Sequence, residues 1–119
     1  MFYKIIEEFE NIIKKYEIRD YKKFGNAKGL IAKIEFIDDS ILHIREYIFL
    51  SGKRKYSFHW QDKEGKLIVR WDNSPHHFHI KTFPDHKHIG DRVFESEEIY
   101  LRDVVKFIEQ QLKQPESKE

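Results

Sequence analysis

Imidazole side chains are concentrated in one segment of this chain, residues 71–88. The segment contains five of the seven histidines, two of the three prolines and one of the two tryptophans. Histidine changes its charge near neutral pH, which makes it the usual side chain for proton transfer and a common metal ligand. A segment that crowds such groups between rigid turns is costly for folding alone, so it predicts a functional site.

One chemistry that this segment supports is metal-independent cleavage of RNA, which requires no cofactor. The reaction needs a base for the ribose 2′-hydroxyl proton, an acid for the leaving oxygen and a cation for the phosphorane charge. We assign the acid, the base and the carboxylate that orients a ring to His76, His77, His86, His88 and Asp72. Contacts to phosphate and RNA are assigned to basic and aromatic side chains: Arg45, Arg70, His59, Lys87 and Tyr47.

Two other interpretations of the same segment remain open. In the first, a metal-dependent hydrolase or phosphodiesterase, the pairs of alternating histidines bind zinc or a similar divalent ion, and Asp72 or Asp85 completes the ligand set. The ligands in that case are His77, His79, His86 and His88. In the second, the histidines and Asp72 form a structural network that holds a loop against the sheet, since buried polar groups must be paired.

Secondary structure is predicted from the spacing of apolar residues. Helical spacing predicts a first helix from Tyr3 to Tyr16 and a second along Leu101 to Leu112, with Ser96 and the acids after it suited to its start. Between them, runs of β-branched and aromatic residues predict five strands: residues 18–24, 30–37, 41–50, 55–62 and 67–73. We therefore expect one α+β domain in residues 1–113, with both helices packed on an antiparallel meander of five to six strands. Residues 114–119 are expected to form a disordered tail.

The hairpin around Glu64-Gly65 can be aligned residue by residue. A two-residue turn pairs Lys63 with Lys66, which determines the register of both strands. The resulting pairs are His59 with Arg70, Ser57 with Asp72, Phe58 with Trp71 and Trp60 with Val69. This register separates polar from apolar side chains, which supports it. The preceding strand has apolar residues on both faces, so both of its orientations remain open.

Composition limits the classes of function. With 22 basic and 21 acidic residues the net charge is +1, so any affinity for RNA must come from a local patch. The absence of cysteine excludes disulfides and thiolate catalysis. We see no signal peptide and no membrane-spanning run, so we expect a cytoplasmic protein, and the many Lys, Glu and Ile residues are typical of heat-adapted proteins. Edge strands of the sheet would allow two copies to pair as a homodimer.

Several stretches of the sequence resemble the TumE family, small toxins of two-gene toxin-antitoxin systems. They are Arg45-Glu46-Tyr47 and residues 56–62, 70–77 and 83–88. The resemblance implies a toxin with an antitoxin partner encoded nearby, commonly a DNA-binding protein, but no particular reaction. Asp39 and Phe78 stand where the family pattern has glycine and proline, and Asp85 where it often has histidine. These positions are therefore poor candidates for essential chemistry.

A toxin of this kind also has a non-enzymatic alternative, a protein that arrests growth by occupying a cellular target through exposed aromatic and arginine side chains. We favour RNA as the substrate of a histidine-based ribonuclease.

Overall fold

A computed structural model describes residues 1–113 of the chain. The predicted disordered tail, residues 114–119, lies outside the described residues. The elements in chain order are α1 (Phe2–Glu8), a 3₁₀ turn η1 (Glu10–Ile12), β1 (Ile13–Phe24), β2 (Ala27–Phe36), β3 (Ile41–Ile48), β4 (Arg54–Gln61), β5 (Leu67–Asp72), β6 (His86–Ile89), β7 (Arg92–Glu95) and α2 (Leu101–Lys113).

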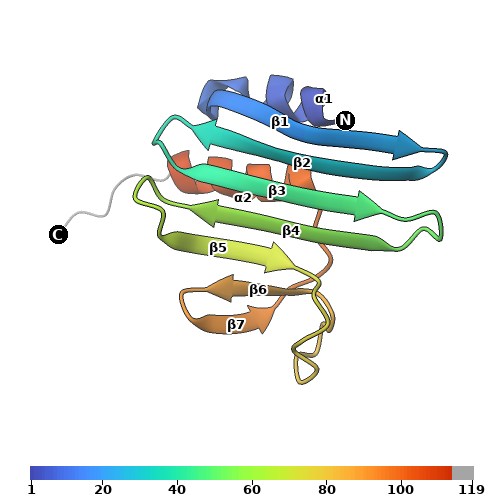
Figure 1. The fold of residues 1–119 in the computed structure, drawn as a ribbon. Helices are drawn as coiled ribbons and strands as arrows, with labels where there is room; N and C mark the ends of the chain where they lie inside the picture. The colour runs from blue at the N-terminus through green and yellow to red at the C-terminus, as the bar shows by residue number, and fades with distance from the viewer. Residues whose placement is uncertain (114–119) are drawn as a thin grey trace.

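The strands form a single seven-stranded sheet in which every strand pairs antiparallel with its neighbours in sequence. Both helices lie on one face of this sheet (Figure 1). The α+β meander with two packed helices is thus confirmed, with two more strands than the five that the apolar runs predicted. No helix in residues 1–113 is long and apolar enough to cross a membrane.

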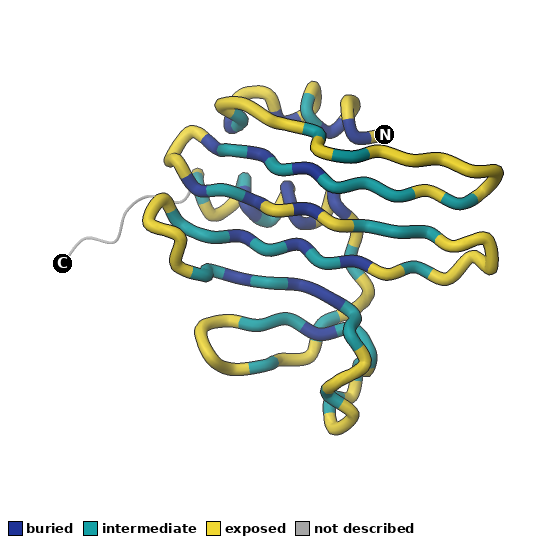
Figure 2. Tube along the Cα trace, viewed as in Figure 1, coloured by how far each residue is buried: buried dark blue, intermediate teal, exposed yellow. Residues whose placement is uncertain are grey.

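The core lies between the helices and the central strands. Side chains alternate between the two faces of a strand, and buried residues accordingly alternate with more exposed ones along the central parts of β2–β4 (Figure 2). Phe107 of α2 packs edge-on against Trp60 and Trp71 of the sheet. α1 joins the same core, and its Glu8 forms an ion pair with Arg102 of α2. Within residues 1–113 no helix lies on the other face of the sheet, and polar side chains are concentrated there.

The predicted first helix, Tyr3 to Tyr16, was too long. The α-helix ends at Glu8, and β1 begins at Ile13, which pairs with Phe36 of β2. Apolar residues at positions 12, 13 and 16 fit a helical spacing, but backbone pairing with β2 overrides that local preference. The second helix begins at Leu101, where the Asp103 side chain accepts a hydrogen bond from the backbone N–H of Tyr100. Ser96 is therefore not its N-cap.

The predicted register of the β4–β5 hairpin is confirmed, although the predicted turn was wrong. Asp62 rather than Lys63 closes the loop, because the Asp62 N–H donates to the Lys66 carbonyl and the loop holds three residues, 63–65. A register shift between Trp60 and Gln61 then leaves Ile68 without a partner. The extra residue in the strand compensates for the extra residue in the loop, so His59 still faces Arg70.

The hairpin of β6 and β7 was missed in the sequence. Gly90 and Asp91 form its two-residue turn, and Gly90 has a φ of 62°, in the left-handed region that favours glycine. A Gly-Asp pair between Ile89 and Arg92 is a known hairpin signal. It was hidden because each strand has only four residues, most of them charged or histidine.

We expect Ile108→Ala to lower the free energy of unfolding by about 2–5 kcal/mol, because Ile108 is fully buried between α2 and the sheet. Urea denaturation followed by circular dichroism measures the change. The control is Gln110→Ala on the exposed side of the same helix, which should alter stability by no more than about 0.5 kcal/mol. Equal effects for the two variants would contradict the placement of this helix.

Candidate functional site

Two rows of polar side chains cross the face of the sheet opposite α1 and α2. Cross-strand partners point to the same face, and Phe58 and Trp71 point to the core, so their neighbours on β4 and β5 point away from it. One row consists of His43, His59, Arg70 and His88, and the other of Arg45, Ser57, Asp72 and His86. Sheet register therefore brings together residues from four strands.

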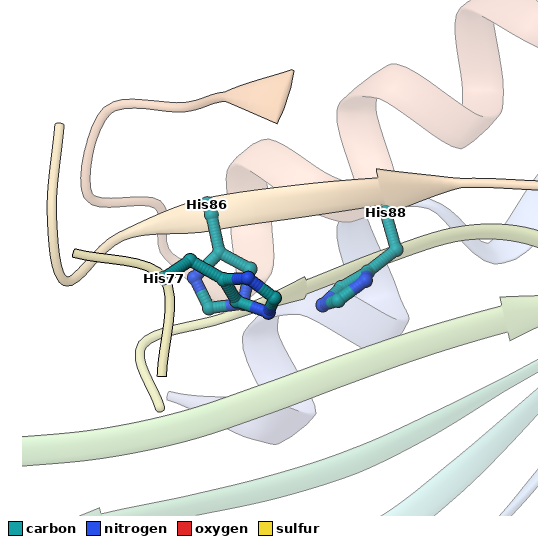
Figure 3. A group of neighbouring side chains, drawn as sticks. All are labelled: His77, His86 and His88. Atoms are coloured by element: carbon teal, nitrogen blue, oxygen red, sulfur yellow. The ribbon is translucent and has the colours of Figure 1, made fainter. Parts of the chain in front are cut away.

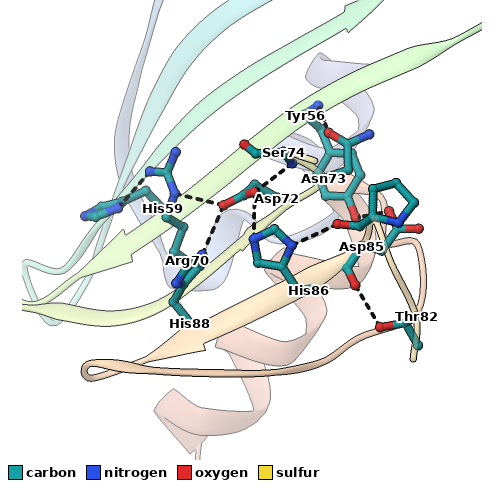
Figure 4. Close-up of polar contacts among 11 residues, drawn as sticks. Tyr56, His59, Arg70, Asp72, Asn73, Ser74, Thr82, Asp85, His86 and His88 are labelled. Atoms are coloured by element: carbon teal, nitrogen blue, oxygen red, sulfur yellow. Dashed lines mark hydrogen bonds and ion pairs between the residues drawn. The ribbon is translucent and has the colours of Figure 1, made fainter. Parts of the chain in front are cut away.

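The Asp72 carboxylate lies at the centre of the site (Figure 4). Its Oδ1 accepts the backbone N–H of Ser74 at 2.9 Å and lies 2.9 Å from Nε2 of His86. Its Oδ2 accepts from Nε of Arg70 at 3.1 Å and lies 3.4 Å from Nε2 of His88. Burial raises the pKa of Asp72, but the Ser74 hydrogen bonds, the charge of His86 and the Arg70 hydrogen bond outweigh it, so this pKa lies below its ordinary value.

Both ring nitrogens of His86 face hydrogen-bond acceptors. Its Nδ1 lies 2.8 Å from the Pro84 carbonyl oxygen, which can only accept, and its Nε2 faces Asp72. Each contact needs a proton on the ring, so the arrangement fits a protonated imidazole paired with the carboxylate. The ring is almost fully buried, with 2% of its side chain exposed. His86 and Asp72 thus join β5, β6 and the loop between them, as the structural interpretation of this segment expects.

His88 and His59 lie on either side of Arg70 and keep access to solvent. Burial is the main cause that lowers the pKa of His88 below its ordinary value; Asp72 opposes the change, while His86, His77 and Arg70 add to it. Burial, Arg70 and His43 likewise lower the pKa of His59. Since Arg70 can only donate, Nδ1 of His59, 3.2 Å from Nη1 of Arg70, accepts. The remaining proton of His59 is therefore on Nε2.

His77 reaches this group from the loop between β5 and β6 (Figure 3). Its ring centre lies 4.8 Å from that of His86 and 5.6 Å from that of His88. One nitrogen from each of the three rings lies within 4.8 Å of the other two. His76 and His79 are exposed on the same loop, and the His79 ring centre lies 6.1 Å from that of His77. The loop thus contributes one of its three histidines to the group.

Side-chain hydrogen bonds hold this loop to the sheet. Asn73 accepts the N–H of Tyr56 and donates to the carbonyl of Arg54, which continues the pairing of β5 with β4. The Tyr56 hydroxyl donates to Asp85 at 2.7 Å, and burial, together with this carboxylate, raises the pKa of Tyr56. Sequence reasoning missed Tyr56 and Asn73 as supporting residues, because side-chain contacts to backbone leave no periodic signal.

The other predicted site residues are more scattered. The sequence left open which side of β3 faces the core. In the structure Leu42 and Ile44 are buried in the core, so Arg45 and the unpredicted His43 lie on the face with the histidines. Tyr47 lies further along the same face, against the backbone of Gly29. Lys87 points to the opposite face, where it lines a groove of about 570 Å³ with Trp71 and Phe107. Lys87 therefore lies apart from the histidine group.

Fold and site together define a small α+β protein with helices on one face of its sheet and a network of histidine, arginine and aspartate on the other. The family model for toxin TumE matches residues 2–112. The chain therefore belongs to the TumE family and functions as a toxin, and this membership implies an antitoxin partner. No curated protein and no solved structure matches the chain.

We expect Asp72→Asn to lower the free energy of unfolding by about 3 kcal/mol, because it leaves the His86 and Arg70 charges without their buried partner. Chemical denaturation at neutral pH measures the loss. Asp91→Asn, in the exposed turn between β6 and β7, is the matched control and should change stability by no more than about 0.5 kcal/mol. A loss of that small size in Asp72→Asn would show that the network contributes little to folding.

Proposed function

We propose that this toxin cleaves RNA on the sheet face opposite its helices. In this proposal Arg70 binds the phosphate to be cleaved, and His88 and His77 transfer protons. The observation that carries it is the contact of one buried carboxylate, Asp72, with both the Arg70 guanidinium and the His88 ring. That contact holds a cation and a base side by side on a face open to solvent, as phosphate chemistry needs.

Arg70 is suited to bind an anion. It uses Nε toward Asp72 and Nη1 toward His59, which leaves further N–H groups to donate to a phosphate oxygen. Its side chain is 37% exposed. Holding the guanidinium in place beforehand reduces the entropy lost when the phosphate binds.

His88 is the proposed base. The Asp72 carboxylate beside Nε2 favours the tautomer that carries its proton there, which leaves the lone pair of Nδ1 available. A carboxylate orients the catalytic histidine of serine proteases in the same way. His88 is three-quarters buried, so its ring has a defined position but still reaches solvent.

The reaction proposed is attack of the ribose 2′-oxygen on the neighbouring phosphorus. Nδ1 of His88 takes the 2′-hydroxyl proton, a bond forms between the 2′-oxygen and phosphorus, and the bond from phosphorus to the 5′-oxygen breaks. Protonated His77 gives its proton to the departing 5′-oxygen. The products are a 2′,3′-cyclic phosphate and a 5′-hydroxyl, and proton exchange with water restores both histidines.

The shape of the face favours an unpaired strand as the substrate. Basic and ring-bearing side chains continue along the two polar rows, from His88 through Arg70 and His59 to His43 and Arg45. An open sheet with such side chains can bind the backbone of single-stranded RNA and stack its bases. The basic residues of this face supply locally the charge that the whole chain, with its net +1, lacks.

We expect His88→Ala to reduce RNA cleavage about 10²–10⁴-fold, the usual range for loss of a proton-transfer group. Purified protein is incubated with total RNA in the presence of a chelator, and the ends of the products are analysed for cyclic phosphate. His79→Ala, an exposed histidine on the neighbouring loop, is the control and should retain full cleavage. RNA that is bound but intact with the wild type would favour a binding toxin, and cleavage abolished by the chelator a metal-dependent hydrolase.

Arg70→Lys tests the phosphate contact separately. Lysine keeps the positive charge near Asp72 but lacks the planar fork that donates several hydrogen bonds at once. We expect folding to be retained and cleavage to fall at least about tenfold. Arg45→Lys, an exposed arginine on β3, provides the comparison and should have the smaller effect. Equal activity of Arg70→Lys and wild type would remove Arg70 from the reaction.

A further inference from the structure

We propose that His77, His86 and His88, together with Asp72, form a binding site for zinc or a similar divalent transition-metal ion. The three rings come from two segments, the loop and β6, and face one another (Figure 3). One nitrogen of each lies within 4.8 Å of the others. The sequence predicted a ligand set with two pairs of histidines, His77 with His79 and His86 with His88. The structure leaves His79 outside the group.

The surroundings of His86 match those of a metal ligand. Histidines that bind a metal usually donate their other N–H to a carbonyl or carboxylate, which orients the ring. Nδ1 of His86 makes this contact with the Pro84 carbonyl at 2.8 Å, so Nε2 is the nitrogen that would bind a metal, in exchange for the proton that it presents to Asp72. Asp72 lies directly beside that nitrogen and supplies a fourth ligand atom.

The distances require only a small rearrangement. Ligand atoms bound tetrahedrally at about 2.0–2.1 Å from zinc lie about 3.4 Å from one another. The separation of His88 Nε2 from Asp72 Oδ2 is already 3.4 Å, and that of His86 Nε2 from Asp72 Oδ1 is 2.9 Å. The ligand nitrogens of the three rings lie within 4.8 Å of one another, so shifts of up to about 1.4 Å bring them to the tetrahedral spacing.

The donor atoms select the class of metal. Imidazole nitrogens favour zinc, copper and nickel, whereas magnesium and calcium prefer oxygen ligands. Zinc bound at Nε2 of His88 would leave the ring proton on Nδ1, so this nitrogen could no longer accept one. Zinc on His77 would likewise prevent that ring from carrying the proton it has to donate. The metal-bound toxin is then the inactive form, a consequence that rests on the proposed RNA cleavage.

Calorimetry with zinc tests the site directly. The full chain, carrying no histidine tag and treated with chelator, should bind one zinc ion and gain at least about 5 °C in melting temperature at a hundredfold excess over Kd. Magnesium in the same titration should give no heat. Absence of zinc binding by the wild type would overturn the proposal.

A pair of histidine variants locates the ion. His77→Ala should lower zinc affinity at least about tenfold, while His79→Ala, on the same loop, should bind as the wild type does. Both variants should melt at the wild-type temperature without zinc, because each side chain projects from a loop. Unchanged affinity in His77→Ala, or an equal loss in both variants, would place the ion elsewhere and overturn the assignment.

The inhibitory consequence has its own readout. Zinc should suppress RNA cleavage by the wild type, and added chelator should restore it. Faster cleavage with zinc would overturn inhibition. If RNA stays intact under all conditions, the proposed reaction fails, while calorimetry still decides whether the metal site exists.

Discussion

The ion pair between Asp72 and His86 is the contact on which the rest of the site depends. A buried carboxylate is costly unless its charge is matched and its oxygens are hydrogen-bonded, and here a backbone N–H, a guanidinium and two imidazoles surround it. His86 in turn holds the Pro84 carbonyl, so the pair connects the last long strand to the loop and to β6. The same carboxylate therefore closes the fold at this edge and positions the groups that face solvent.

The two faces of the sheet differ in role: one packs the core that stabilises the fold, and the other carries the candidate site. One face is covered by both helices and holds the aromatic core, which supplies the apolar burial that folding needs. No helix of the described part of the chain packs on the other face, so histidine and arginine can occupy adjacent strands without leaving buried polar groups unpaired. Because alternation along each strand assigns residues to a face, the register of β3–β6 determines which side chains meet.

Sequence patterns predicted the parts of this protein that depend on periodicity. The α+β class, the second helix and the pairs His59 with Arg70 and Ser57 with Asp72 follow from alternation of polar and apolar residues, which the core enforces over several strands. The predicted first helix was too long, because the spacing of apolar residues alone cannot show that residues 13–16 pair with another strand. The short β6 and β7 were missed because polar residues dominate them.

The histidine-rich segment stands out in the sequence, and the structure brings three of its histidines together, but the surroundings of each depend on contacts that sequence spacing does not specify. His86 and His88 are two residues apart on one face, yet only His86 is sealed beneath the loop. Partners such as the Pro84 carbonyl and the Ser74 amide are backbone groups, common to every residue type. His43 was within reach of prediction, since it lies opposite His59 once β3 is assigned its buried face.

The unpaired Ile68 in β5 bears on how chain length can vary in this family of folds. Ile68 lies between Leu67 and Val69, which are opposite the adjacent residues Gln61 and Trp60. Removal of Ile68 alone would therefore leave Arg70 and Asp72 opposite the same partners on β4, with a regular strand in place of the bulge. Removal of any other residue of β5 would need a change at the bulge to keep these pairs. Relatives one residue shorter in β5 should thus retain the same neighbours on the polar face.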